Sequence, residues 1–462
     1  MRAHSRVNDR MSPPPQAARG AGTRRAGVVA ALLAVSALAP AGAETVRLTA
    51  EDAASRAVAV SHLAAAAGER AAAAREAVTA ADAAARPQVT ASAALAQRSS
   101  VPEFQLPFAA PGQPALVLVP DITTTYGAGV RVAEAIYAGG AIAAQRFASR
   151  HDAEAAAAAH LQTAAETRLA ARAAYWEAVR AAAAIDAVAA QEERAGRLLT
   201  DTSALLDAGM AVKADLLAAR ERVASARVAR IAAAAAAANA LAQLRSLLHI
   251  DSGVAVELAD SLAGALPDVP APLDELRRRA LAARPELAAA AARIAAASAR
   301  ERLARAPSRP GVAAVAQWAY DRPNQRYFPQ QDAWRQSWSV GVSASWTLFD
   351  GGKSRADAAS SQAGQRAATE DREELARRIG LEVETDRRNL ESALAAVGAA
   401  DAARAAARER ETAARERYAA GLAAMAEILD AEAQLANADQ QQIDVRAAAW
   451  LADAALARAV GR

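Results

Sequence analysis

The stretch WSVGVSASWTL, residues 338–348, alternates between apolar side chains at even positions and small or polar side chains at odd positions. A period of two over eleven residues is typical of a β-strand that crosses a membrane at a tilt, with lipid on one side and water on the other. A half-buried hairpin of an ordinary globular protein shows the same alternation in a single strand. Four of the six tryptophans lie between residues 318 and 346, as expected of an aromatic belt at a membrane surface. We therefore expect a membrane-spanning strand over Trp338–Leu348.

This strand belongs to an internal duplication with an offset of 212 residues. Corresponding positions are Gly139 and Gly351, Gly209 and Gly421, and the segments 215–217 and 427–429. A repeat that keeps one register without gaps indicates two copies of one supersecondary unit. Each unit is expected to supply two strands, which are Gln88–Gln97 with Tyr126–Ile136 and Val312–Tyr320 with Trp338–Leu348.

Long helices are expected after each Gly-Gly pair. Seventy residues without a proline separate Gly139 from Gly209, and the same interval separates Gly351 from Gly421. A continuous helix of about 65 residues would be roughly 100 Å long. Helices of about 35 residues should follow and complete two antiparallel hairpins, and further helices are expected before the strands. These helices are Lys213–His249, Met425–Val460, Thr49–Ala85 and Pro285–Ala306.

The chain therefore divides into three parts. Residues 1–43 have the features of a signal peptide, with Arg24 and Arg25 before the apolar run Ala26–Leu38 and small residues at 41–43. The first repeat is expected over 44–260 and the second over 261–462. Each repeat contains a helix, a β-hairpin (87–137 or 310–349) and a long helical hairpin (140–249 or 353–460).

Charge and cysteine content exclude several function classes. The formal net charge of +3 comes from the signal peptide, which holds six of the 54 basic residues and one of the 51 acidic ones. Its removal leaves 48 basic and 50 acidic residues, a net charge of −2, so we expect no nucleic-acid partner. The absence of cysteine excludes disulfides, thiolate metal sites and a lipid-modified N-terminal cysteine.

Barrel closure predicts the oligomeric state. No run of 18 strongly apolar residues follows the signal peptide, so a membrane crossing must use strands. Four strands cannot close a barrel, and an open edge in hydrocarbon leaves backbone groups unpaired. A dimer would give eight strands, whose interior side chains fill, whereas a trimer gives twelve strands and a lumen. We expect a homotrimer whose barrel contacts outer-membrane lipid.

Four motifs in combination resemble the TolC family of outer-membrane factors. They are Arg-Pro-Glu-Leu (284–287), Leu-Phe-Asp-Gly-Gly (348–352), Tyr418-x-x-Gly421 and Ile-Leu-Asp-Ala (428–431). The resemblance covers Leu48 to Gly461. It implies a mainly α fold with transmembrane β: a trimeric twelve-stranded outer-membrane barrel, four strands per protomer, continuous with a periplasmic α-helical barrel. It also implies export through a tripartite efflux pump or a type I secretion system, with a periplasmic adaptor and an inner-membrane pump of RND, ABC or MFS type.

The resemblance also assigns roles to residues near the hairpin turns. Gly209, Met210, Gly421 and Leu422 resemble the tips that adaptors bind, although each glycine could simply supply a left-handed turn. Glu427 and Asp430, spaced i, i+3, resemble the acids of a pore constriction, and the alternative is a solvated helix surface.

Tyr418 and Asp215 match residues that keep the family's duct closed. Ala423 stands where the family has an arginine. Either this duct closes more loosely, or Arg415 or Arg417 substitutes for the missing cation.

An enzyme and a stalk are the competing classes. The five histidines have no metal-ligand spacing, and no Gly-x-Ser-x-Gly motif occurs, so we expect no catalytic residue, metal or cofactor. A structural or adhesive coiled-coil surface protein would also be rich in long helices. Such a stalk has no use for the strand pattern of residues 338–348.

Overall fold

The computed structural model describes residues 45–106 and 115–462, so the expected signal peptide lies outside the described residues. Residues Thr45–Arg462 form one compact unit. Its α-helices are α1 (Ala50–Val60), α2 (His62–Ala83), α3 (Ala141–Asp207), α4 (Lys213–Leu247), α5 (Leu273–Ala283), α6 (Pro285–Arg305), α7 (Lys353–Ala419) and α8 (Met425–Ala459). Its strands are β1 (Thr45–Leu48), β2 (Gln88–Gln97), β3 (Phe104–Leu106), β4 (Leu116–Val119), β5 (Thr124–Ala138), β6 (Ala255–Leu258), β7 (Gly311–Arg322) and β8 (Arg335–Ser345).

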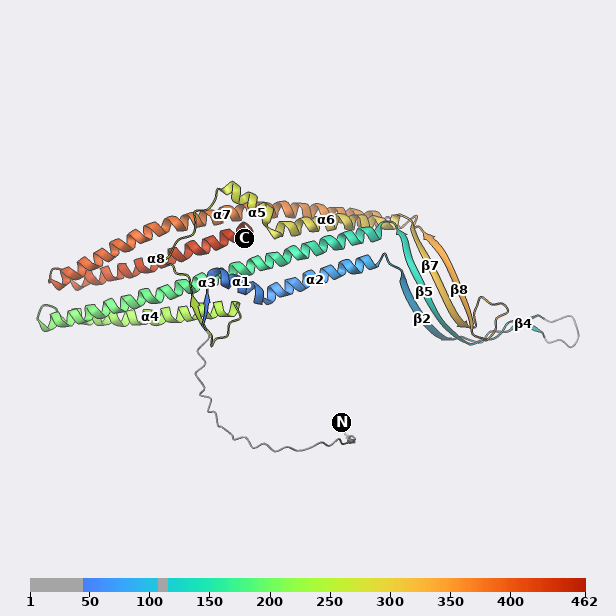
Figure 1. Ribbon diagram of the computed structural model, residues 1–462, viewed down its shortest axis with the longest axis horizontal. Coiled ribbons are helices and arrows are strands. Elements are labelled where there is room, and N and C mark those ends of the chain that lie inside the picture. The colour runs from blue at the N-terminus through green and yellow to red at the C-terminus, as the bar shows by residue number, and fades with distance from the viewer. Residues whose placement is uncertain (1–44, 107–114) are drawn as a thin grey trace, which may run out of the picture. The chain divides into compact units, whose positions relative to one another are not determined.

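A four-stranded antiparallel sheet extends from one end of the helices (Figure 1). Its order is β2-β5-β7-β8, so each repeat supplies one antiparallel pair and the β5–β7 pairing joins the repeats. This confirms the four strands expected from the sequence. Strands β2 and β8 are the two edges of the sheet.

The sheet has one apolar and one polar face. Register places Val89, Val132, Ala316 and Val340 in one row on the first face. The adjacent row on the other face contains Thr90, Arg131, Gln317 and Ser339. Rings gather on the apolar face near its outer end, where Tyr320 stacks on Trp334 with centroids 4.9 Å apart. This distribution fits a sheet with lipid on one face and water on the other.

Strand β8 corrects the expected bounds of Trp338–Leu348. It begins three residues earlier, because pairing with β7 continues to Asp321 and Arg335. It ends at Ser345, because its partner strand begins at Gly311, directly after Pro310. Beyond that point Trp346 has no strand to pair with, and its Nε1 donates to the carbonyl oxygen of Ser308 at 3.0 Å.

The helices continue the order of the strands. Helix α2 leads into β2, β5 leads into α3, α6 leads into β7 and β8 leads into α7 (Figure 1). The packed helix pairs α2–α3, α3–α6 and α6–α7 therefore repeat the order of the sheet. Towards the hairpin turns the order becomes α4-α3-α8-α7. Helices α3 and α7 have 67 residues each, which confirms the expectation of about 65.

Two glycines turn each strand into its long helix. Gly140 and Gly352 precede α3 and α7 with φ of 90° and 87°. At Gly139 a Cβ would lie 2.5 Å from the carbonyl oxygen of Ala306, so this close approach requires glycine.

The expected helix Thr49–Ala85 is interrupted at Ser61. The backbone there is extended (φ −66°, ψ 119°), and Ser61 ends α1 and caps α2 by accepting the Ala64 N–H at 3.3 Å. A serine side chain competes well for backbone donors at a helix start, which accounts for the break.

A belt of short elements surrounds the middle of the long helices. It includes the parallel pair β1–β6 and helices α1 and α5, of which β1, β6 and α5 were not expected from the sequence. Tyr175 on α3 anchors this belt: its hydroxyl donates to the carbonyl oxygen of Leu48 and accepts the Asp260 N–H, both at 3.0 Å. Beside it, Trp176 and Trp450 stack with centroids 4.5 Å apart.

Across the described ranges, no helix combines the length and apolarity that a bilayer crossing needs.

We predict opposite outcomes for arginine at two adjacent positions of β8. Val340→Arg places a charge on the apolar face at mid-strand, where arginine costs about 2–4 kcal/mol in a membrane barrel. Ser339→Arg places the same charge on the polar face and should be tolerated. The measurement is the amount of folded protein in outer-membrane fractions. Equal yields of both variants would contradict the assignment of the faces.

Candidate functional site

The two hairpin turns have the same backbone geometry. Gly209 and Gly421 follow α3 and α7 with φ of 75° and 72°. The residue after each glycine then closes the turn: Met210 N–H donates to Leu205 O, and Leu422 N–H donates to Arg417 O, both at 2.8 Å. This six-to-one bond is the Schellman helix end, which needs a left-handed residue.

Apolar side chains project from both turns. Met210 is 68% exposed and Leu422 is 72% exposed. A Cβ at either glycine would meet no atom within 4 Å, so backbone conformation alone requires glycine there. Each tip thus presents at least one exposed apolar side chain on a hydrogen-bonded turn.

The predicted constriction acids face arginines of their own hairpin. Arg417 on α7 forms an ion pair with Glu427, and Arg410 forms one with Asp430 at 2.7 Å. Both acids lie on α8 just beyond the turn. Sequence reasoning missed these partners, although residues equally distant from the turn of an antiparallel hairpin lie opposite each other, as Arg417 and Glu427 do. The charge of the acids is therefore offset within one chain.

The two predicted closing residues are not joined in the described residues. Asp215 lies in the first turn of α4 and accepts the Val212 N–H at 3.3 Å. Tyr418 is buried beside Met425 and Ile428, and its hydroxyl has no hydrogen-bond partner there. Their contact across protomers stays a prediction.

Arg417, and not Arg415, lies beside the turn that contains Ala423, the position where the family has an arginine. Besides its ion pair, Arg417 donates to the carbonyl oxygen of Leu422 at 3.4 Å, so its side chain lies along the turn. Arg415 instead lies against Glu411 and Glu432 inside the hairpin.

A buried carboxylate links the two hairpins, and sequence reasoning missed it. Glu432 on α8 is 2% exposed and accepts a hydrogen bond from Arg222 on α4 at 3.3 Å. Burial raises the pKa of the Glu432 carboxyl despite the nearby Arg222 and Arg415. The available signal was the spacing Ile428, Glu432, Leu435, which places the acid on the buried face of α8.

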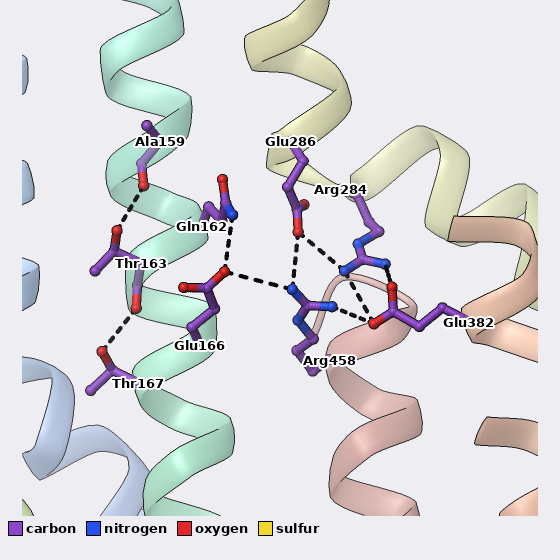
Figure 2. Close-up of polar contacts among 9 residues, drawn as sticks. All are labelled: Ala159, Gln162, Thr163, Glu166, Thr167, Arg284, Glu286, Glu382 and Arg458. Atoms are coloured by element: carbon purple, nitrogen blue, oxygen red, sulfur yellow. Dashed lines mark hydrogen bonds and ion pairs between the residues drawn. The ribbon is translucent and has the colours of Figure 1, made fainter. Parts of the chain in front are cut away.

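A charged joint connects the end of α8 to the start of α6 (Figure 2). Arg284 directly precedes α6 and donates to Glu382 at 2.5 Å and to Glu286 at 3.1 Å. Arg458, in the last turn of α8, bridges the same two glutamates and lies 3.7 Å from Glu166 on α3. Arg458 in the last turn of α8 and Glu286 in the first turn of α6 also each interact favourably with the dipole of their own helix. Four helices are thereby held at one point.

Comparison with known proteins decides the family. The profile described as "Outer membrane efflux protein" matches residues 53–248 and 276–462, one stretch in each repeat. The chain belongs to the outer membrane efflux protein family. It is therefore an outer-membrane protein of a channel family, as the sequence predicted. No sequence among curated proteins matches it significantly.

Solved structures of membrane channels and outer-membrane proteins confirm the fold. The OprN outer-membrane channel has 23% identity and a TM-score of 0.71, with 89% of both chains covered. CusC has 18% identity and a TM-score of 0.75, covering 89% of this chain and 92% of its own. VceC from Vibrio cholerae has 18% identity and a TM-score of 0.71, covering 89% and 96%.

Beside the charged joint, Asp386→Asn should stabilise this family member at neutral pH. Burial, and then the charge of Glu382, raise the pKa of the Asp386 carboxyl above its ordinary value of 3.8. A raised folded-state pKa means that ionisation destabilises the fold as pH rises through it, so the benefit of asparagine should appear at pH 7.5 and vanish towards pH 4. Thermal unfolding in detergent should show a shift of about 2 °C.

The matched control is Asp371→Asn, an exposed position on the same helix α7. It should leave the melting temperature unchanged at both pH values. Destabilisation by Asp386→Asn at pH 7.5 would contradict the assignment.

Proposed function

We propose that three copies of the chain form a duct that exports substrates across the periplasm and the outer membrane. The observation that carries this proposal is the four-stranded sheet, which has one apolar face and two long edges, β2 and β8, without a partner in the described chain. Unpaired backbone groups cost several kcal/mol each in hydrocarbon. Pairing β8 of one copy with β2 of the next removes both edges at once.

The helices support the same closure. Helices α2 and α7 are the outer members of the order α2-α3-α6-α7 and continue the edge strands β2 and β8. A copy that pairs its β2 with the neighbour's β8 therefore also brings its α2 to the neighbour's α7. Three copies give twelve strands, enough for a lumen. A coiled-coil stalk, the alternative function, would not require a sheet with one apolar and one polar face.

Reconstitution tests the duct. The full protein, extracted from outer-membrane fractions in detergent, should be trimeric by light scattering and should open conducting pores in planar bilayers. Circular dichroism should show mostly helix with a minor strand content, which separates a duct from a porin. A stable monomer that needs no detergent would overturn the proposal.

The partners follow from the tips. We assign Gly209, Met210, Gly421 and Leu422 to docking with a periplasmic adaptor, which connects the duct to an inner-membrane pump of RND, ABC or MFS type. Exposed apolar side chains on two equivalent rigid turns favour a protein partner. The pump selects between drug efflux and type I secretion.

Removal of the apolar tips should abolish export and spare assembly. The double change Met210→Ser and Leu422→Ser keeps both glycine turns and removes only the apolar groups. Export, measured as drug resistance or secreted protein with the cognate pump present, should be lost, while trimer yield stays normal. The control Val269→Ser alters an 80% exposed apolar residue between β6 and α5 and should have no effect. Full export by the double variant would place docking elsewhere.

Glu427 and Asp430 remain the proposed acids of the constriction, with Tyr418 and Asp215 as closing contacts between neighbouring copies. Because Arg417 and Arg410 offset the two acids, the double change Glu427→Gln and Asp430→Asn leaves two uncompensated cations per copy. It should therefore shift ion selectivity in bilayers towards anions, most strongly at low salt, where screening is weak.

The control for the entrance is Glu370→Gln, an exposed acid far along α7. It should not alter selectivity. Unchanged selectivity in the double variant at low salt would mean that the two acids do not line the conduction path.

A further inference from the structure

Arginines collect on the polar face of the sheet. Arg131 stands on this face in the row between Thr90 and Gln317. Arg98 continues the same face one residue beyond β2, where its N–H donates to Thr123 O at 2.7 Å. Both side chains are exposed, and neither forms an ion pair with any described residue.

The loop between β7 and β8 adds a third arginine. Residues 323–326 line a hollow of about 480 Å³ together with polar-face residues of all four strands. Asn324, 3% exposed, fixes the loop by donating to Arg335 O at 2.9 Å and to Ser337 Oγ at 3.1 Å. Arg326 donates to Trp338 O at 2.6 Å and, within the described chain, has no carboxylate partner. The strand segments that line this hollow lie at the end of the sheet away from the helices (Figure 1).

One acid faces these arginines. Asp321 lines the same hollow, and its Oδ1 would lie 2.8 Å from a Cβ on Gly127, so glycine at 127 gives it room. Arg335 also belongs to this face, but its guanidinium donates to Gln331 and lies 5.6 Å from the ring of Tyr327. On the polar face, Arg98, Arg131 and Arg326 against Asp321 leave two net positive charges per copy, without counting Arg335. Asp121, which accepts from the Val101 N–H in the loop beyond Arg98, does not line the hollow.

The region of the hairpin turns and the polar face of the sheet therefore differ in charge. Near the hairpin turns each predicted constriction acid has an arginine partner. On the polar face of the sheet, Arg98, Arg131 and Arg326 are exposed and have no ion pair with a residue that the structure describes. Charges of one sign along a water-filled path, with low-dielectric walls, concentrate counter-ions within it.

We propose that the barrel of the duct is an anion-selective filter, formed by Arg98 and Arg326 at its outer mouth and by Arg131 at mid-strand, and that its cargo passes most readily as anions. The inference rests on the proposed trimeric duct, in which three copies place six net positive charges around one lumen. The field of each arginine extends about 8 Å, the Debye length at physiological salt, so ions that pass along the polar face come under the influence of these charges.

Reversal potentials test the filter. Wild-type trimers in phosphatidylcholine bilayers under a tenfold KCl gradient should favour chloride over potassium. The variant Arg98→Gln, Arg131→Gln and Arg326→Gln should lower the chloride-to-potassium permeability ratio at least about twofold. Inorganic triphosphate added on the side of the barrel should reduce the wild-type current and have little effect on the variant.

Two single variants serve as controls. Asp321→Asn removes the one acid of the hollow and should raise the permeability ratio. Arg322→Gln removes a cation from the outer end of the same sheet, but on its apolar face, where Arg322 bonds Asp332 at 2.7 Å, and should leave the ratio unchanged.

The outcomes separate the two proposals. Pores whose permeability ratio is the same in wild type, the triple variant and Asp321→Asn overturn the filter and leave the duct intact. Assembled protein that forms no pores overturns the duct and the filter together. A ratio that responds to Arg322 but not to the three arginines shows that the faces are reversed and also overturns the filter.

Discussion

The backbone of the sheet edges is the constraint on which the structure depends. Strand β2 presents ten residues and β8 presents eleven, each with one side unpaired among the described residues. In water such edges would be a liability that charges or bulges would cover, but in hydrocarbon every group must find a partner. The order of the helices follows from that of the strands, because each strand of the sheet is joined directly to a helix.

The helical part is held by a few concentrated contacts rather than by a large apolar core. Alanine dominates the buried positions, and small side chains contribute little burial each. The belt core around Tyr175 and Trp176, the charged joint at Arg284 and the buried Glu432 supply the specific contacts. Buried charges add little net stability but are destabilising when their partners are removed, so they favour one arrangement of helices over others.

Local pattern predicted much of this fold, and its errors have physical causes. The alternation of residues 338–348 identified a strand but not its ends, because the ends depend on where β7 begins and on Pro310. The glycines at 209 and 421 marked the turns, since a left-handed position is a local requirement. Strands β1 and β6 have four residues each, too few for a period to show, and they are stabilised by pairing across about 200 residues of chain.

By itself, the sequence determined the period-two strand, the duplication, the long proline-free helices and the turn glycines, because each depends on residues close together in the chain. Only the tertiary structure decided which charges meet. Glu427 and Asp430 were visible as acids, but their neutralisation by Arg417 and Arg410 required the hairpin to be closed. Likewise, Arg98, Arg131 and Arg326 share one face because strand register and a folded loop bring them there. Coulomb energy depends on distance in space, and the fold, not the spacing along the chain, sets that distance.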